Sequence, residues 1–148
     1  MIVYLNATCK RSDMSHAITR LNPSTMPNSA QIGYSQISIV DPGRMAYISG
    51  QVATLGTGAP APSDLVSQME IVVANIKAAL TALGAGPENI VIARCFMTDL
   101  TPERLEQVFP PLLDLFDGAM PCLTGVGVAA LAGPDLQVEL ELTVRLPD

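Results

Sequence analysis

The sequence predicts an α+β domain in which two helices cover one face of a mixed β-sheet. Two segments, residues 63–84 and 101–116, carry apolar residues three or four positions apart, as on one face of a helix. Residues 136–146 instead alternate between apolar and polar side chains, which is typical of a strand with one face against the helices. The expected order is strand, strand, helix, strand, helix, strand, strand, which suits a sheet with its helices on one side.

The composition indicates one well-filled domain with few charges. Of the 148 residues, 49% are hydrophobic and 15% are charged, and one core commonly serves about 100–200 residues. We expect residues 18–148 to form the domain and residues 1–17 to precede it as an extension. We interpret residues 1–13 as an upstream addition or a start-site artefact, the alternative being an ordered arm. The low charge predicts a homo-oligomer, because contacts between copies cover apolar surface.

Charge and cysteine content argue against several classes of function. The net charge is −6, with eight lysines and arginines and no tryptophan, which disfavours nucleic-acid binding because a phosphate backbone requires clustered positive charge. The widely spaced Cys9, Cys95 and Cys122 and the single His16 give neither a zinc-ligand spacing nor a disulfide framework. We therefore expect no metal and a reducing cytoplasm. No apolar run approaches the roughly 18–20 residues of a membrane span.

The first part of the domain is expected to be a loop followed by a β-hairpin. Residues 14–33 are rich in Ser, Thr, Asn and Pro, which predicts a loop lying over the domain rather than a regular element. Residues 35–40 and 45–49 are predicted to be the two strands of a hairpin, joined by a tight turn at residues 41–43. Gly50 then allows a close approach of the backbone to another group.

A long helix follows a loop over residues 56–62. Ser63 is the expected N-terminal cap, with Asp64 in the first turn, where the helix dipole favours a negative charge. Gly84 is the expected C-terminal glycine. The predicted buried stripe consists of Leu65, Met69, Val72, Ile76 and Leu80.

The second half of the domain is expected to repeat strand and helix. Residues 90–97 predict a strand, and Thr101 and Pro102 predict a helix start. The consecutive prolines at 110–111 should kink that helix or split it in two. Residues 123–131 predict a strand before the final one at 136–146. The stripe of the second helix is Leu105, Val108, Leu112 and Leu115 or Phe116.

Short motifs along these elements resemble the RidA (YjgF-type) family over about residues 18–147. The motifs are residues 32–36 (IGYSQ), 48–52 (ISGQV), 75–78 (NIKA), 96–100 (FMTDL), 120–121 (MP) and 138–141 (VELE). The resemblance implies a chorismate-mutase-like fold and a homotrimer whose sheets line a central barrel, with small carboxylate-bearing metabolites bound in clefts between subunits. Active members hydrolyse imines and enamines such as 2-aminoacrylate without a cofactor. For the ribonuclease activity also associated with the family, the charge of −6 gives no support.

The resemblance also implies a set of cleft residues. Tyr34 matches a tyrosine that lines the cleft, and Ser49 and Gly50 match the backbone beside the ligand. Gly125 matches a position whose main chain orients the attacking water, and Glu139 matches the glutamate near that water, which would accept its proton. For Tyr34 and Glu139 the alternatives are ordinary packing and a solvated strand face.

At residue 123 the chain departs from the family pattern. Active members carry an arginine two residues after a proline, which binds the substrate carboxylate through two hydrogen bonds. Here the segment is Pro121, Cys122, Leu123, Thr124. Loss of one partner of a buried charge pair costs about 2–5 kcal/mol, or roughly 30-fold to several thousand-fold in affinity. We therefore expect a divergent member without the usual deaminase activity, with Leu123 and Thr124 beside its ligand.

The remaining arginines and the cysteines are weaker candidates for the site. Arg94 is the best substitute for the missing arginine, although an ion pair with Glu139 or Glu141 is the favoured interpretation. Arg44 and Arg145 are expected to be exposed. Cys122 lacks a nearby group to activate it as a nucleophile, and Cys95 is expected in the core.

Three functions therefore stay open. The first is a small-molecule-binding protein without the usual deaminase activity. The second is a cofactor-free imine or enamine hydrolase of altered substrate range that uses Glu139, the Gly125 main chain and a bound water. The third is a structural or regulatory trimer with vestigial clefts.

Overall fold

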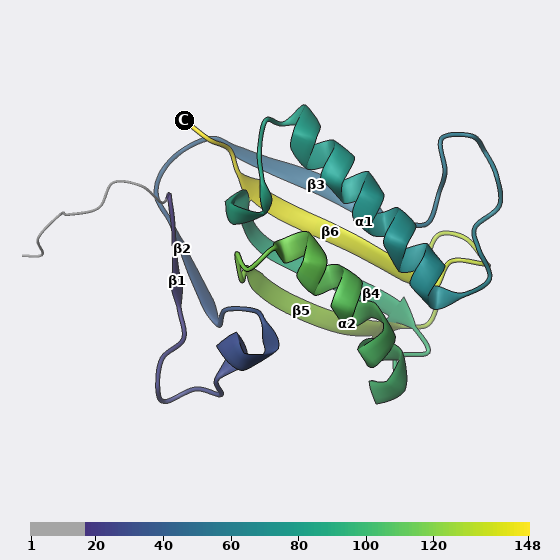
Figure 1. The fold of residues 1–148 in the computed structure, drawn as a ribbon, viewed down its shortest axis with the longest axis horizontal. Helices are drawn as coiled ribbons and strands as arrows, with labels where there is room; N and C mark the ends of the chain where they lie inside the picture. Colours follow the sequence, from purple (N-terminus) through teal and green to yellow (C-terminus); the bar gives the residue numbers. More distant parts are fainter. Residues whose placement is uncertain (1–16) are drawn as a thin grey trace, which may run out of the picture.

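The computed structural model describes residues 17–148, which form a four-stranded sheet covered by two helices, with a two-stranded sheet beside it (Figure 1). The strands are β1 (Ile18–Leu21), β2 (Ile37–Val40), β3 (Met45–Gln51), β4 (Ile90–Thr98), β5 (Cys122–Val128) and β6 (Val138–Arg145). The helices are α1 (Leu65–Ala82) and α2 (Pro102–Phe116), with short 3-10 helices at Ser29–Ile32 and Pro87–Asn89. Cys9, His16 and residues 1–13 lie outside the described residues.

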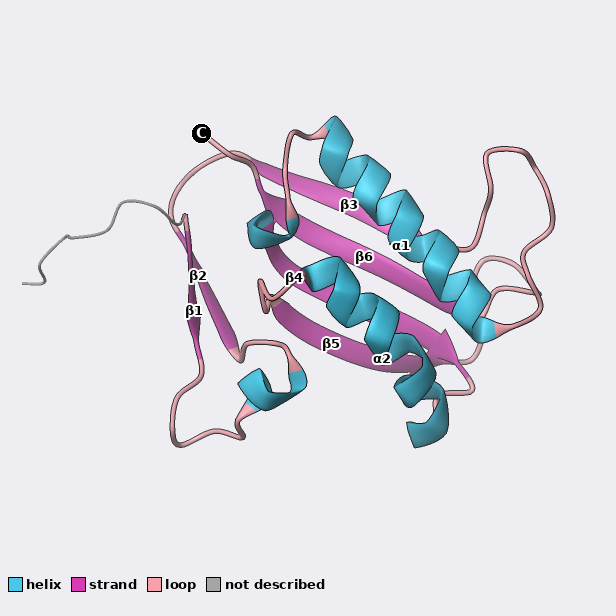
Figure 2. Cartoon of the chain, in the orientation of Figure 1, coloured by secondary structure: helices cyan, strands magenta, loops and turns pink. Residues whose placement is uncertain are grey.

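The larger sheet is mixed, as predicted. Its strand order is β3-β6-β4-β5. Strand β6 pairs antiparallel with both β3 and β4, whereas β5 runs parallel to β4 because α2 carries the chain back between them. Both helices lie on one face of this sheet (Figure 2). The predicted α+β class, with two helices on one face, is confirmed.

The core lies between that sheet face and the two helices. Every predicted stripe residue of α1 is buried, and in α2 the buried residues are Val108, Leu112, Leu115 and Phe116. Strand β6 contributes Val138, Leu140, Leu142 and Val144. By length and composition alone α1 could cross a membrane, although its apolar stripe packs into this core. Cys95 is buried in the core, as expected.

The predicted hairpin between residues 35–40 and 45–49 is wrong. Strand β2 pairs with β1, and β3 pairs with β6. Residues 14–33 were expected to lack regular structure, yet they contain β1 and a 3-10 helix. Arg20 explains why β1 is stable despite its four residues: its guanidinium donates to Ser38 Oγ at 2.9 Å and to the Ile90 carbonyl at 2.6 Å. These bonds attach the two-stranded sheet to the beginning of β4.

The helix ends follow the sequence with small differences. The cap of α1 is Asp64 rather than Ser63, since its side chain accepts a hydrogen bond from the Ser67 N–H at 2.8 Å. Gly84 has the left-handed φ of 62° expected after a helix, and Thr101 caps α2.

Pro110 and Pro111 were predicted to kink α2 or to split it, and the split does not occur, because the helix continues past both residues. Proline removes the bond to the carbonyl four residues earlier. Those carbonyls belong to Glu106 and Gln107, both exposed, so water can satisfy them.

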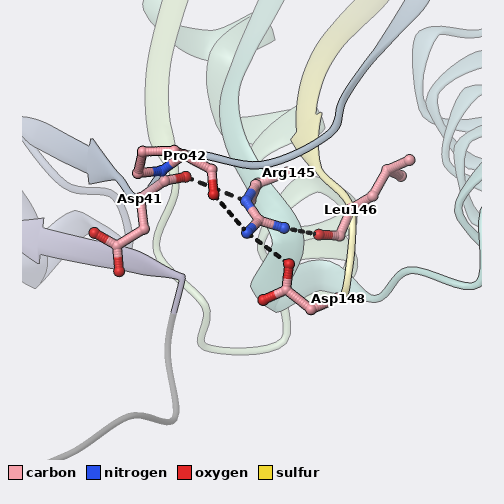
Figure 3. Close-up of polar contacts among 5 residues, drawn as sticks. All are labelled: Asp41, Pro42, Arg145, Leu146 and Asp148. Atoms are coloured by element: carbon pink, nitrogen blue, oxygen red, sulfur yellow. Dashed lines mark hydrogen bonds and ion pairs between the residues drawn. The ribbon is translucent and has the colours of Figure 1, made fainter.

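Arg145 was predicted to be exposed and is instead 2% exposed. Its guanidinium donates to the carbonyls of Asp41 (3.3 Å), Pro42 (3.1 Å) and Leu146, and it pairs with the Asp148 carboxylate at 2.9 Å (Figure 3). The end of β6 is therefore covered by the segment that joins β2 to β3. Arg44, in the same segment, is exposed as expected.

Candidate functional site

The two faces of the four-stranded sheet carry different chemistry. Residues in register on neighbouring strands point to the same side, and the row Ala93, Leu142 and Ile48 packs toward the helices. The alternate residues of each strand lie on the opposite face, which the helices leave uncovered (Figure 2). On that outer face Tyr47 is 79% exposed. The outer face is therefore available for a ligand or another copy of the chain.

Gly50 and Glu139 are brought together at an irregularity of β3. The register of β3 on β6 shifts between Ile48 and Gln51, so that two residues of β3 stand opposite one residue of β6. A β-bulge of this kind bends the strand and leaves its extra residue unpaired. A Cβ atom at position 50 would lie 1.8 Å from Glu139 Oε1. The predicted backbone approach at Gly50 is thus an approach to the predicted catalytic carboxylate.

Ser49 lies at the same bulge and is exposed. Its carbonyl accepts a hydrogen bond from the Gln51 side chain at 3.0 Å. On α1, Asn75 donates to the carbonyls of Val52 and Thr54 at 3.2 Å each, which holds the segment that follows β3. Asn75 belongs to one of the matching motifs, but its role was missed because only the fold shows that its helix faces this segment.

The other predicted site residues lie on β5, at the edge of the sheet. Leu123 is in register with Ala93 and packs against the core. Thr124 is in register with Arg94 and is exposed on the outer face. Gly125 is exposed, and a Cβ there would meet nothing within 4 Å.

Tyr34 lies near the beginning of β5 and is half-buried. Its neighbour Ser35 bridges to Cys122 and donates its backbone N–H to the Pro121 carbonyl at 3.1 Å. Ser35 itself is 1% exposed, and its hydroxyl makes no hydrogen bond within the described chain.

One chain does not bring Leu123 and Glu139 together. Strand β4 separates β5 from β6, and two strand spacings amount to about 10 Å. The two side chains also point to opposite faces, because Leu123 shares the face of Ala93 whereas Glu139 pairs with Phe96 on the outer face. The predicted site residues therefore fall into two separate groups within one chain, with Gly50 and Glu139 at β3 and β6, and Leu123 on β5 with Tyr34 near the beginning of that strand.

Arg94 is engaged in an ion pair. Its Nη1 lies 2.8 Å from Glu141 Oε1, and the two residues are in register on β4 and β6. The side chains are 43% and 36% exposed. Glu141 is one of the two partners that the sequence suggested. Its carboxylate neutralises the Arg94 charge that a substrate carboxylate would otherwise bind. In contrast, the Glu139 carboxylate forms no hydrogen bond or ion pair with residues 17–148.

The two cysteines of the described chain lie in different surroundings. Burial raises the pKa of the Cys95 thiol to about 11. Cys122 lies 3.2 Å from Ser38 Oγ, which also contacts the Val91 carbonyl. No group of three His, Cys, Asp or Glu side chains in this part of the chain could hold a metal ion.

Comparison with known proteins points to one family. The family model described as endoribonuclease L-PSP matches residues 25–146. Protein DfrA of Myxococcus xanthus is 37% identical over 66% of this chain and 74% of its own length. TdcF of Escherichia coli, named as a reactive intermediate deaminase, is 29% identical over 69% of this chain and 79% of its own.

Solved structures agree with that match. The Rid-family protein YyfB from Yersinia pestis has a TM-score of 0.83 at 33% identity, over 88% of this chain and 99% of YyfB. The structure of E. coli TdcF with bound serine has a TM-score of 0.63 at 27% identity, over 77% of this chain and 88% of TdcF.

Proposed function

The chain belongs to the endoribonuclease L-PSP family, which contains the Rid and YjgF proteins, and on that premise we propose that it binds a small metabolite in clefts between copies of itself. The two separate groups of predicted site residues support this proposal. Gly50 and Glu139 lie at β3 and β6, whereas Leu123 and Tyr34 lie at β5. If the β5 edge of a second copy lay against the bulge of β3, residues from both copies would complete one cleft.

A homotrimer is the assembly proposed for these clefts. The outer sheet face carries the exposed Tyr47, and the two-stranded sheet exposes Ile39 (51%) and Leu21 (39%). Subunit contacts would cover such apolar surface. In a trimer the three outer faces would line a barrel, with the clefts at its edges. A reducing cytoplasm suits the free Cys95 and Cys122.

The ligand is proposed to lack a carboxylate at the point where 2-imino acids carry one. The observation that carries this proposal is that Leu123, where active members have arginine, packs against the core. Leucine offers no hydrogen bond to an anion and removes water that would otherwise solvate it. Because Arg94 is paired with Glu141, it supplies no free charge in compensation. Neutral or weakly acidic imines, enamines and related carbonyl compounds are the class that fits.

Hydrolysis of such a ligand is the second candidate function, and the unpaired carboxylate of Glu139 favours it. A water molecule would attack the imine carbon and give its proton to that carboxylate. That proton would then pass to the imine nitrogen, giving a carbinolamine. The hydroxyl proton of the carbinolamine would next move to the same nitrogen by way of the carboxylate, the C–N bond would break, and ammonia would leave while the carbonyl forms. The Gly125 main chain would orient the water. Neither a metal nor an organic cofactor is required by this sequence of steps.

A binding experiment tests the proposed ligand class. Serine, found bound to TdcF, and serinamide, in which an amide replaces the carboxylate, are titrated into the native protein and into Leu123→Arg. We expect serine to bind Leu123→Arg at least 30-fold more tightly than it binds the native protein, with little difference for serinamide. Leu123→Met is the matched uncharged control. Equal affinity of the native protein and Leu123→Arg for serine would contradict the proposal.

A further inference from the structure

The space that a side chain would need at position 50 is filled by Glu139. The nearest atoms to a Cβ built on Gly50 are Glu139 Oε1 at 1.8 Å, Cδ at 2.5 Å and Cγ at 2.9 Å. All three belong to one side chain, so any residue other than glycine would collide with it.

Backbone conformation does not explain the glycine at this position. The glycines with positive φ in the described chain are Gly33, Gly58, Gly84 and Gly118. Gly50 is outside this set, so its φ is not one that requires glycine. Space for the neighbouring carboxylate is the reason for a residue without a side chain that the packing at this position shows.

Contact with the bulge also limits where the carboxylate can lie. Glu141, two residues further along β6, is held by its ion pair with Arg94 at 2.8 Å. Glu139 has no such partner in residues 17–148. The bulged backbone at Gly50 is the surface against which Glu139 Oε1 and Cδ pack.

We propose that Gly50 is a positioning residue, whose missing side chain leaves the space in which the Glu139 carboxylate lies at the bulge of β3. This inference deepens the proposed function, since it assigns how the water-activating carboxylate is placed. It predicts that any side chain at position 50 displaces the carboxylate while Glu139 itself is retained.

Crystal structures of the native protein and Gly50→Ala give the direct test. We expect the Glu139 carboxylate to move by about 1 Å or more, because ordinary van der Waals contact begins near 3.4 Å and the added Cβ would lie at 1.8 Å. If instead Glu139 keeps its position and β3 shifts away, the proposal is overturned. If Gly50→Ala does not fold, it is combined with Glu139→Asp, which shortens the carboxylate side chain by one methylene. Recovery of folding in that variant supports the proposal, and continued failure contradicts it.

A thermal-unfolding cycle provides a second readout that needs no substrate. Gly50→Ala is compared in the native, Glu139→Ala and Glu141→Ala backgrounds. We expect any fall in Tm caused by Gly50→Ala to vanish in the Glu139→Ala background and to persist in the Glu141→Ala background. A fall in Tm of the same size in all three backgrounds would show that Gly50 serves strand packing alone.

Enzyme activity gives a further test, which rests on the proposed function. Its outcomes distinguish failure of the proposed function from failure of the inference about Gly50. For a hydrolysed imine, Gly50→Ala should lower kcat to the level of Glu139→Ala, and the double variant should be no worse than Glu139→Ala. Additive losses in the double variant would contradict the positioning role. If no imine is hydrolysed by the native protein, the hydrolase function fails, while the crystal structures still decide the role of Gly50.

Discussion

Replacing Arg145 with alanine should destabilise the protein far more than its place near the chain end suggests. The side chain is 2% exposed and donates to three backbone carbonyls besides pairing with Asp148 (Figure 3). Each hydrogen bond to a charged group contributes about 1.5–3 kcal/mol, and such contributions do not add fully. Asp41 and Pro42 are exposed, so water can replace part of what the guanidinium supplies. We therefore expect a loss of about 2–4 kcal/mol in the free energy of unfolding.

Urea unfolding followed by circular dichroism measures this loss, and for a domain of this size it corresponds to a fall in Tm of roughly 4–16 °C. Arg44→Ala is the matched control, because Arg44 lies in the same segment but is exposed, and surface changes usually stay within about 0.5 kcal/mol. Arg145→Lys keeps the charge but loses the planar fork of donors, and it should recover only part of the stability. The reasoning is refuted if Arg145→Ala costs no more than Arg44→Ala.

Two further predictions follow from buried polar groups. Burial raises the pKa of the Cys95 thiol to about 11, above the roughly 8.5 of a cysteine in the unfolded chain. The contribution of this thiol to the free energy of unfolding is therefore complete below about pH 8.5 and is lost as the pH rises toward 11. Site-resolved mass spectrometry at pH 8 should show slower alkylation of Cys95 than of Cys122, and equal rates would contradict this. Gln68 is fully buried and bonds to the Pro62 and Asp135 carbonyls and the Gln137 N–H at 2.7–2.8 Å. Gln68→Met should lower the free energy of unfolding by about 2–4 kcal/mol, whereas Gln107→Met, at an exposed position, should change it little. Similar values for both variants would contradict a stabilising role for the Gln68 hydrogen bonds.

Periodicity predicted the elements well where one face of the element is buried. The stripe of α1 and the alternation of β6 are both confirmed, because burial of one face leaves a regular trace in the sequence. The segment containing β1 left no such trace, since Arg20 occupies its centre and is stabilised by carbonyls about 70 residues away.

Strand partners could not be predicted from neighbouring sequence. A turn at residues 41–43 suggests a hairpin, yet β3 pairs with β6, about a hundred residues later. Arg145 was misplaced for the same reason, because its partners Asp41 and Pro42 are more than a hundred residues away.

The sequence motifs predict which residues belong to the candidate site, but only the structure shows how those residues are arranged. Motifs identify Gly50, Glu139 and Leu123, but they do not say on which face of the sheet each lies. That depends on the register of β5 on β4 and on the bulge in β3. The separation of the predicted site residues into two groups within one chain is therefore a property of strand pairing.

The most direct test of the account is hydrolysis of 2-iminopropionate, generated in situ, by the native protein and by Leu123→Arg. Circular dichroism of both proteins first establishes that each is folded, because Leu123 packs against the core. We expect the native protein to be inert and Leu123→Arg to gain activity, since the arginine restores the charge for the substrate carboxylate. Efficient hydrolysis by the native protein would contradict this expectation, and Arg94 would then be the first residue to test as the carboxylate-binding group.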